Sequence, residues 1–205
     1  MALFITFEGT EGAGKSTLIR AFAKKLDRLS AQKIILTREP GGSAVAEKIR
    51  SLILDEAMHP WTELFLYEAS RAEHLHRVIL PALSKGHTVL CDRFSDSSLA
   101  YQGYARGLPW KTVGVLNQIA TQGLTPDLTV FLDIDPALGL KNAQVQTRFE
   151  KEGLKFQRKV RQGFLKAMRE SPKRWISLKA RSGTPEELAE KLLMHIQNKF
   201  KKRKF

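Results

Sequence analysis

The stretch GTEGAGKS, residues 9–16, constrains the fold of this chain more than any other feature. Its first and last glycines stand five positions apart, and the last is followed directly by a lysine and a hydroxyl side chain. A short apolar run, residues 3–7, precedes it, and apolar residues recur at helical spacing from Leu18 to Leu26 after it. This order predicts a glycine-rich turn between a buried strand and a helix. An acid, Glu11, lies in the middle of the turn.

A turn of this kind binds phosphate groups. Its backbone N–H groups converge on one point, and the helix N-terminus adds a favourable dipole for anions. G-x4-G-K-S between a strand and a helix is the P-loop pattern, which predicts binding of a nucleoside triphosphate such as ATP. We expect Lys15 to bridge the β- and γ-phosphates and the Ser16 hydroxyl to bind Mg²⁺. The predicted ATP-binding residues are Gly9, Thr10, Glu11, Gly12, Ala13, Gly14, Lys15, Ser16 and Thr17.

Strand and helix patterns alternate along the rest of the chain. Predicted strands cover residues 3–7, 33–38, 87–92, 127–135 and 175–180. Helices are expected from Ser43 as N-cap, over residues 61–84, and after the Thr184–Glu187 capping box. The pattern predicts one α/β domain, residues 1–205, of the P-loop NTPase type. Its sheet is expected to have five mostly parallel strands with helices on both faces.

Composition narrows the cellular setting and the partners. Cys91 is the single cysteine, so no intramolecular disulfide can form, and a reducing, cytoplasmic location is expected. No apolar stretch approaches the length of a membrane span. The net charge of +13 raises nucleic acid as a partner, but few aromatic residues lie among the basic ones. A solvated basic surface with a basic tail, residues 199–205, is the simpler interpretation.

Three arginines are predicted at or near the carboxyl edge of the sheet, where ligands of open α/β folds bind: Arg38, Arg71 and Arg93. Each alone is equally consistent with a surface ion pair, but together they favour a second phosphate-bearing ligand. Asp92 could hold the Mg²⁺ water shell or simply cap a helix. Tyr67, one helical turn before Arg71, could stack on a base or fill the core.

These motifs in this order resemble the thymidylate kinase family in its bacterial form. The segments are FEGTEGAGKST, TREPGG, YEASRAEH, DRF-x4-LAYQG and PDLTVFLDID, and the resemblance runs from about residue 2 to residue 193. The resemblance implies transfer of the γ-phosphoryl group of ATP to dTMP, with Mg²⁺, by an enzyme that is usually a homodimer. It also implies a lid over the site, at about residues 143–155.

The resemblance assigns roles around dTMP residue by residue. Tyr67 would stack on thymine, Arg71 would contact the base, and Ser98 would lie against it. Tyr101 would lie near the sugar 2′ carbon, with Gln102 as a neighbour. Arg93 would bind the acceptor phosphate, and Arg38 would help to line the same pocket. Glu11 would face the acceptor, near the 3′-hydroxyl, and orient Arg93. Asp92 and Ser16 would serve Mg²⁺.

The lid sequence departs from the family pattern. The lid of related enzymes opens with several arginines and contains an Asp-Arg pair, whereas this chain has KNAQVQTRFEKE with Thr147 in place of the aspartate. The P-loop of this chain also lacks an arginine. We therefore expect Arg148 to be the cation at the transition state, together with Lys15 and Arg93, with Lys151 and Lys155 as alternatives.

Two other functions stay open at this point. One is a different nucleoside monophosphate or deoxynucleoside kinase, although an acceptor-phosphate site at Arg93 argues against a nucleoside. The other, favoured less, is a nucleic-acid-associated P-loop ATPase, suggested by the net charge.

Overall fold

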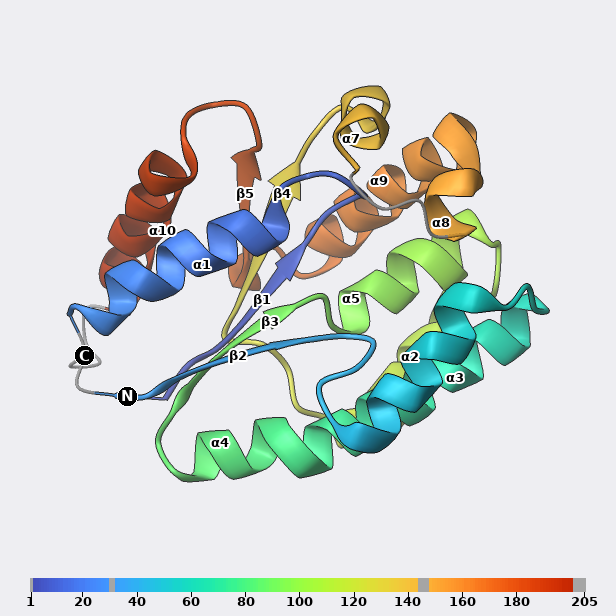
Figure 1. Ribbon diagram of the computed structural model, residues 1–205, viewed down its shortest axis with the longest axis horizontal. Coiled ribbons are helices and arrows are strands. Elements are labelled where there is room, and N and C mark those ends of the chain that lie inside the picture. The colour runs from blue at the N-terminus through green and yellow to red at the C-terminus, as the bar shows by residue number, and fades with distance from the viewer. Residues whose placement is uncertain (1, 30–31, 144–147, 201–205) are drawn as a thin grey trace.

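The computed structural model describes residues 2–29, 32–143 and 148–200 (Figure 1). Five strands form one sheet in the order β2-β3-β1-β4-β5, and every pairing between them is parallel. The strands are β1 (Phe4–Glu8), β2 (Ile34–Arg38), β3 (Thr88–Asp92), β4 (Leu128–Asp133) and β5 (Trp175–Lys179). The predicted parallel sheet is confirmed. Because β1 lies between β3 and β4, the loop after β1 emerges at the middle of the carboxyl edge.

Helices connect the strands and cover both faces of the sheet (Figure 1). They are α1 (Lys15–Asp27), α2 (Ala44–Asp55), α3 (Pro60–His74), η1 (Leu75–Ile79), α4 (Leu80–Ser84), α5 (Ser95–Ser98), η2 (Leu99–Ala105), α6 (Trp110–Ala120), α7 (Pro136–Asn142), α8 (Arg148–Lys151), α9 (Gly153–Glu170), η3 (Pro172–Arg174) and α10 (Pro185–Lys199). In these described residues, no helix has the length and apolar character that crossing a membrane requires.

The alternation of side chains along β1 divides the core. Ile5 and Phe7 pack on one face with residues of α1 and α10. Phe4 points to the opposite face, where it packs with residues of η1, α4 and β3. A third cluster, with Phe131 and Phe164 at its centre, joins β4 to α9 and η2. These apolar layers fix the carboxyl edge of the sheet, where the functional loops begin.

Local sequence signals set several of the helix ends as expected. Ser43 caps α2 by accepting a hydrogen bond from the backbone N–H of Ala46, and the Thr184–Glu187 capping box of α10 is present. The predicted helix over residues 61–84 is also found, but it contains one π-helical segment, η1. A second π-helical segment, η2, carries Tyr101 and Gln102. π-helical turns are frequent at functional sites, and η2 faces the second cavity described below.

Candidate active site

The glycine-rich loop follows β1 directly, and α1 begins at its end. Gly14, the N-cap of α1, has a φ of 88°, a left-handed conformation that a residue with a Cβ rarely adopts. A Cβ on Gly12 would collide with the backbone carbonyl oxygen of Gly139 in α7, so this position has room for glycine alone. The loop therefore has its predicted position, and α7 packs tightly against it.

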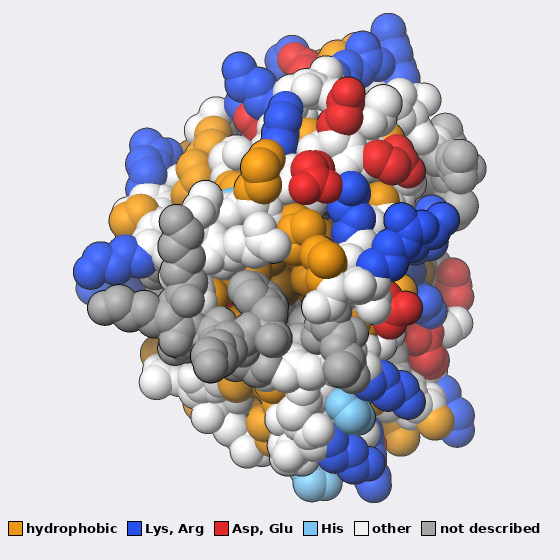
Figure 2. Space-filling model, turned by 90° about the vertical axis from the view of Figure 1, so that its left-hand side faces the viewer, with side chains coloured by type: hydrophobic (Ala, Val, Ile, Leu, Met, Phe, Trp, Pro, Cys, Tyr) orange, Lys and Arg blue, Asp and Glu red, His pale blue; other side chains and the backbone are white. Residues whose placement is uncertain are grey.

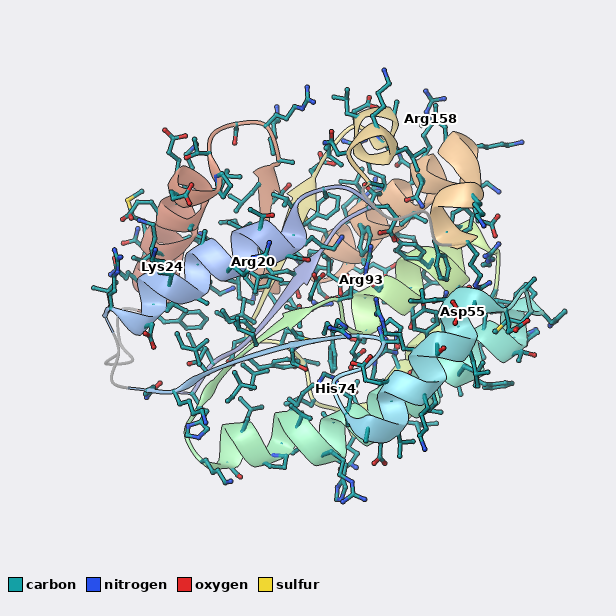
Figure 3. The ribbon with its side chains drawn as sticks, viewed as in Figure 1. Arg20, Lys24, Asp55, His74, Arg93 and Arg158 are labelled. Carbon is teal, nitrogen blue, oxygen red and sulfur yellow. The ribbon has the colours of Figure 1, made fainter. Side chains whose placement is uncertain are left out.

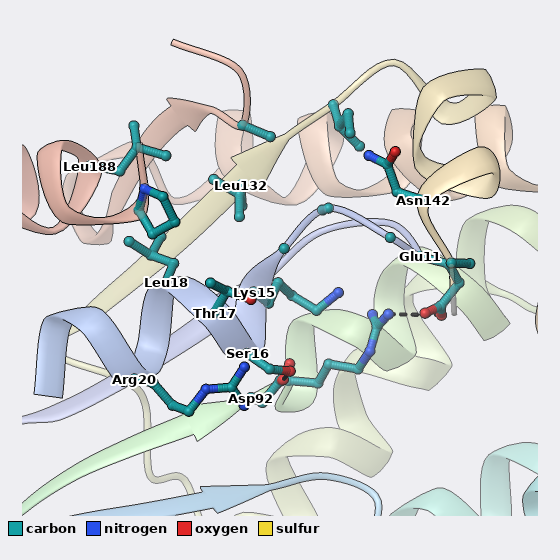
Figure 4. Close-up of a pocket in the computed structure, with 18 of the residues that line it drawn as sticks. Glu11, Lys15, Ser16, Thr17, Leu18, Arg20, Asp92, Leu132, Asn142 and Leu188 are labelled. Atoms are coloured by element: carbon teal, nitrogen blue, oxygen red, sulfur yellow. Dashed lines mark hydrogen bonds and ion pairs between the residues drawn. The ribbon is translucent and has the colours of Figure 1, made fainter. Parts of the chain in front are cut away.

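A cavity of about 720 Å³ opens at this loop (Figure 4). Residues 11–17 line one end, and the turn between β5 and α10, including Arg181, also lines it. Gly9 and Thr10 are not among the lining residues; their carbonyl oxygens accept hydrogen bonds from Lys15 Nζ at 3.1 and 3.0 Å. Burial, reinforced by nearby Arg93, lowers the pKa of Lys15. The lysine is thus held close to where phosphates would meet the loop.

Two oxygen ligands for a cation lie together in this cavity. Ser16 Oγ donates a 2.8 Å hydrogen bond to Asp92 Oδ2, and both residues line the cavity. Hydroxyl and carboxylate oxygens suit Mg²⁺, which keeps several waters and binds chiefly through phosphate groups. Among the residues that the structure describes, no group of three or more His, Cys, Asp or Glu side chains could hold a metal ion. The Ser16 and Asp92 oxygens fit an ion that arrives with the nucleotide, because such an ion needs few protein ligands.

Glu11 in the loop is bound from two sides. Its Oε1 accepts a 2.7 Å bond from Arg93 Nη2 and a 2.9 Å bond from the Tyr101 hydroxyl. Burial raises the pKa of Glu11, but the charges of Arg93 and Lys15 outweigh it and lower that pKa overall. The expected pairing of Glu11 with Arg93 is present, although the two residues lie 82 positions apart.

Arg93 is held at the centre of the molecule, near the end of β3 and the start of α5 (Figure 3). Its φ of 68° is unusual for a residue with a side chain, a kind of backbone strain that clusters at functional sites. The buried carboxyl group of Glu8 braces this turn, because it accepts a hydrogen bond from Phe94 N at 2.8 Å and shares a 2.6 Å hydrogen bond with Ser97 Oγ. Burial, reinforced by Asp96, raises the pKa of Glu8 to about 8.

A second cavity, of about 320 Å³, lies on the other side of the Glu11–Arg93 pair. Both cavities share four lining residues, Glu11, Glu39, Arg50 and Arg93. The predicted dTMP-site residues Tyr67, Arg71, Tyr101 and Gln102 also line the second cavity. The structure thus brings together most of the acceptor residues that the sequence resemblance implied.

Arg71 forms the buried base of the second cavity. Its Nε donates to Glu39 Oε2 at 2.8 Å and its Nη1 to Glu68 Oε1 at 2.7 Å. Nη1 also reaches Ser98 and Asn117, and Nη2 donates to the Phe94 carbonyl. Burial alone would lower the pKa of Arg71. The negative charges of Glu68 and Glu39 raise it by a larger amount, so the pKa of Arg71 lies above its ordinary value. Among the described residues, the second N–H of Nη2 has no acceptor and remains available to a ligand.

Aromatic rings line the same cavity. The Phe149 ring lies 6.4 Å from Tyr67 and 5.8 Å from Tyr101, centroid to centroid, in edge-on arrangements. Phe149 belongs to α8, in the expected lid, so a lid residue forms part of the acceptor pocket. Phe149 was not predicted from the sequence.

Three residues that were expected at the acceptor site or at the transferred phosphate contact other groups instead. Arg38 donates twice to Glu47 and lines the first cavity instead of the second. Ser98 lies beneath Arg71 and does not line the second cavity. Arg148 donates to the Ile53 carbonyl, forms a 2.8 Å ion pair with Glu63, and lines neither cavity. The role of Arg148 as the transition-state cation stays a prediction. Lid residues 144–147 and residues 201–205 of the tail lie outside the described residues.

Arg50 lines both cavities and was not predicted from the sequence. Its Nη1 donates to the Pro40 carbonyl at 2.8 Å, and burial together with Arg38 lowers its pKa. The signal was present in the sequence, because Arg50 shares a helix face with Ala46 and Ile53, both buried. An arginine on the buried face of an amphipathic helix indicates a buried partner or a ligand.

Comparison with known proteins agrees with this geometry. The sequence profile described as thymidylate kinase matches residues 7–192. Thymidylate kinase of Pelobacter propionicus is 46% identical over an alignment of 208 positions that covers 96% of this chain and 94% of the relative. That of Enterococcus faecalis is 46% identical over 187 residues, 87% of this chain and 88% of the relative. The crystal structure of thymidylate kinase from Ehrlichia chaffeensis superposes with a TM-score of 0.80 at 30% identity, covering 96% of this chain and 98% of that one.

Proposed function

This chain belongs to the thymidylate kinase family, and from that premise we propose that it transfers the γ-phosphoryl group of ATP to dTMP, giving dTDP. The observation that carries the proposal is the pair of joined cavities. One is built on a phosphate-binding loop, the other offers polar groups and aromatic rings for a pyrimidine nucleotide, and Glu11, Arg50 and Arg93 lie at their junction. Donor and acceptor phosphates would therefore meet between these three side chains.

ATP occupies the first cavity in this proposal. Backbone N–H groups of residues 11–17 hold its phosphates, and Lys15 exchanges its bonds to the Gly9 and Thr10 carbonyls for phosphate oxygens. Ser16 and Asp92 would hold Mg²⁺, which neutralises phosphate charge when bound.

The base of dTMP binds in the second cavity. Tyr67 stacks on thymine, and the free Nη2 proton of Arg71 donates to a carbonyl oxygen of the base. Gln102 adds an amide contact. Ser98 acts indirectly, because its hydroxyl oxygen helps to fix the Arg71 guanidinium.

The sugar and phosphate of dTMP lie toward the P-loop. Glu11 accepts a hydrogen bond from the 3′-hydroxyl while it holds Arg93, and the Tyr101 ring occupies the space that a ribose 2′-hydroxyl would need. Arg93 binds the acceptor phosphate, and Arg38 contributes charge from the side of the first cavity.

Phosphoryl transfer then depends on alignment and charge neutralisation, without a covalent intermediate. Lys15, Arg50 and Arg93 line the space between the nucleotides and stabilise the charge that develops there. Arg148 joins them in the proposal only after leaving Glu63, as the lid segment, residues 143–155, closes and excludes water. The whole chain acts as a single domain.

We also propose that the protein is a homodimer. Large apolar side chains are exposed on three helices: Leu52 on α2, Phe65 on α3, and Val115 and Ile119 on α6. α3 packs against both α2 and α6, so we infer that these side chains form one helical surface. An apolar surface of this kind is typical of a subunit interface. Ile119→Glu is expected to give a monomer in light scattering; an unchanged mass would contradict the assignment.

Two further parts of the proposal concern the cellular location of the protein and its macromolecular partners. The buried free thiol of Cys91 suits the reducing cytoplasm. Nucleic acid is not proposed as a partner. On the face in Figure 2, basic side chains are scattered around the edge with acidic ones among them and form no single stripe.

A panel of acceptors tests the proposed function. ATP-dependent phosphorylation of dTMP, dUMP, dCMP, AMP and thymidine is compared in one coupled assay, with Lys15→Met as the inactive control. We expect dTMP to have the highest kcat/KM, and no reaction with thymidine because it offers no phosphate to Arg93. A better acceptor than dTMP would refute the assignment. ATP hydrolysis stimulated by DNA would favour the ATPase alternative.

A further inference from the structure

Glu63 on α3 is fully buried, and the proposed reaction gives it no role. Its Oε1 accepts a 2.7 Å hydrogen bond from Gln102 Nε2. Its Oε2 pairs with Arg106 at 3.2 Å and with Arg148 at 2.8 Å. One carboxylate therefore joins a side chain of the acceptor cavity to two arginines from other parts of the chain.

The two arginines determine the chemical state of Glu63. A buried carboxylate is stable when it is paired, and both oxygens of Glu63 contact guanidinium N–H groups, at 3.2 and 2.8 Å for Oε2 and at 3.4 Å for Oε1. An ionised carboxylate has no proton and accepts hydrogen bonds only. The Gln102 amide must therefore turn its NH₂ group toward Glu63, because its carbonyl oxygen would face another acceptor there.

This orientation leaves the Gln102 carbonyl oxygen as the free end of the amide. No side chain or backbone group in the described part of the chain donates to that oxygen, and Gln102 lines the second cavity. Arg71 lines the same cavity, and among the described residues its Nη2 group has Phe94 O as its one acceptor, which leaves a second N–H for a base. The cavity thus offers a base one fixed acceptor and one fixed donor.

We propose that Glu63 is a positioning residue that selects the acceptor base by fixing the orientation of the Gln102 amide. A matching base presents a ring N–H to Gln102 and a carbonyl oxygen to Arg71, as thymine does at N3 and O4. Cytosine presents the opposite pattern, an acceptor at N3 and an amino group at position 4, and is rejected because both protein groups would be unpaired. This proposal rests on the proposed function and specifies how its site discriminates.

Glu63→Gln tests the proposal with almost no change in volume. A glutamine at position 63 can donate as well as accept, so the Gln102 amide can turn over and present its NH₂ group to the cavity. We expect the ratio of kcat/KM for dTMP to that for dCMP to fall by about tenfold or more, because a site that hydrogen-bonds its substrate discriminates strongly only while its groups are fixed. The KM for ATP is expected to stay within about twofold, since Glu63 lines neither cavity.

Three other variants separate positioning from general stability. Arg106→Gln removes one partner of Glu63 but leaves its ion pair with Arg148 before the lid closes, so the ratio of the binding constants for dTMP and dCMP, measured without ATP, should be retained. Glu63→Asp keeps the charge but withdraws the oxygen from Gln102, so the kcat/KM ratio should fall even if Glu63→Gln does not fold. In a Gln102→Ala background, Glu63→Gln should change the ratio no further, because the two residues act through one contact.

The outcomes distinguish this inference from the proposed function. A wild-type protein that does not prefer dTMP would refute the proposed function itself. A wild-type protein that prefers dTMP, with the preference intact in folded Glu63→Gln or Glu63→Asp, would overturn the role of Glu63. An equal fall in the Gln102→Ala background would also overturn it, since Glu63 would then act on the whole pocket.

Discussion

The two cavities share a wall but are built in different ways. Much of the first is formed by consecutive residues, 11–17, with Lys15 folded back onto the loop. The second is assembled from side chains on separate elements, with Arg71 from α3, Gln102 from η2 and Phe149 from α8 among them. A phosphate of any nucleotide can use the first arrangement, whereas the second has a specific pattern of donors and acceptors.

The difference indicates which site residues also stabilise the fold and which act mainly on the ligand. Arg71 lies on two buried carboxylates, so truncating it would leave uncompensated charges in the core and cost about 3–5 kcal/mol of stability. Ser16 and Asp92 lie at the mouth of the first cavity and are partly exposed, so changes there act mainly on the ligand. Specificity is thus built into the stable core, while phosphate binding is carried by a loop at its edge.

Arg93→Ala is expected to have the largest effect, because Arg93 lines both cavities. We expect kcat/KM for dTMP to fall by about 10³-fold or more in the coupled assay. Calorimetric titration with a non-hydrolysable ATP analogue should give a Kd within about threefold of the wild-type value, since the loop keeps its backbone donors. Arg93→Lys keeps the positive charge but loses the two parallel N–H donors of the guanidinium group, so its kcat/KM for dTMP should lie between those of the wild type and Arg93→Ala. If Arg93→Ala retained its turnover of dTMP, Arg93 would not bind the acceptor phosphate during the reaction.

Glu11→Ala tests whether Glu11 acts on the acceptor dTMP or on the donor ATP. Glu11 belongs to the P-loop in sequence, but its carboxylate binds Arg93 and Tyr101 on the acceptor side. We expect the KM for dTMP to rise by about 10- to 100-fold and the KM for ATP to change by less than about threefold. Steady-state kinetics in both substrates measure this, with Glu11→Gln as the isosteric control. A larger change for ATP would assign the acid to the donor side.

Arg148→Ala and Arg50→Ala, compared side by side, identify the remaining catalytic cation. If Arg148 leaves Glu63 to reach the phosphates, its removal should lower kcat by about tenfold and affect the KM for dTMP less. Single-turnover kinetics with saturating dTMP provide the measurement. An unchanged kcat in Arg148→Ala, with a loss in Arg50→Ala, would transfer the role to Arg50, which lines both cavities already.

Glu8→Gln should have the smallest effect on turnover and a clear effect on pH dependence. The pKa of Glu8 is about 8, above the ordinary value of 4.5, so the folded protein holds a proton that the unfolded chain has released. This contribution to stability is complete below the ordinary pKa and is lost as pH rises through about 8.

Urea unfolding between about pH 5 and pH 9 tests the assignment. As pH rises, the free energy of unfolding of the wild type should fall more steeply than that of Glu8→Gln. The difference between the two losses across the range should be on the order of a few kcal/mol. Glutamine imitates the protonated acid because it can donate to Ser97 and accept from Phe94 N. Parallel curves for the two proteins would show that Glu8 is ionised in the folded state.

The sequence predicted the parts of the site that depend on short segments. The P-loop, the five parallel strands and the caps at Ser43 and Thr184 follow from neighbouring residues, whose spacing determines their geometry. The Glu11–Arg93 pair was implied only by family resemblance, because no local pattern relates residues 82 positions apart.

Other parts of the site depend on tertiary packing. Tyr67 and Arg71 could be placed on one helix, but the buried acids around Arg71 come from different segments. Arg148 was assigned to the phosphates because it matches the arginine of the family's lid pair, whereas in the folded chain it forms an ion pair with Glu63. Arg50 differs from these residues, because a basic residue on the buried face of a helix can be recognised from the helical spacing of its neighbours.

The most direct test is whether the acceptor pocket recognises thymine before ATP binds. Arg71 and Gln102 are held in place by buried carboxylates of the protein itself. Calorimetric titration of the wild-type protein, without ATP, should therefore show binding of dTMP and at least about 100-fold weaker binding of dCMP. Equal affinity for the two nucleotides, or binding of dTMP only when an ATP analogue is present, would contradict a preformed acceptor pocket.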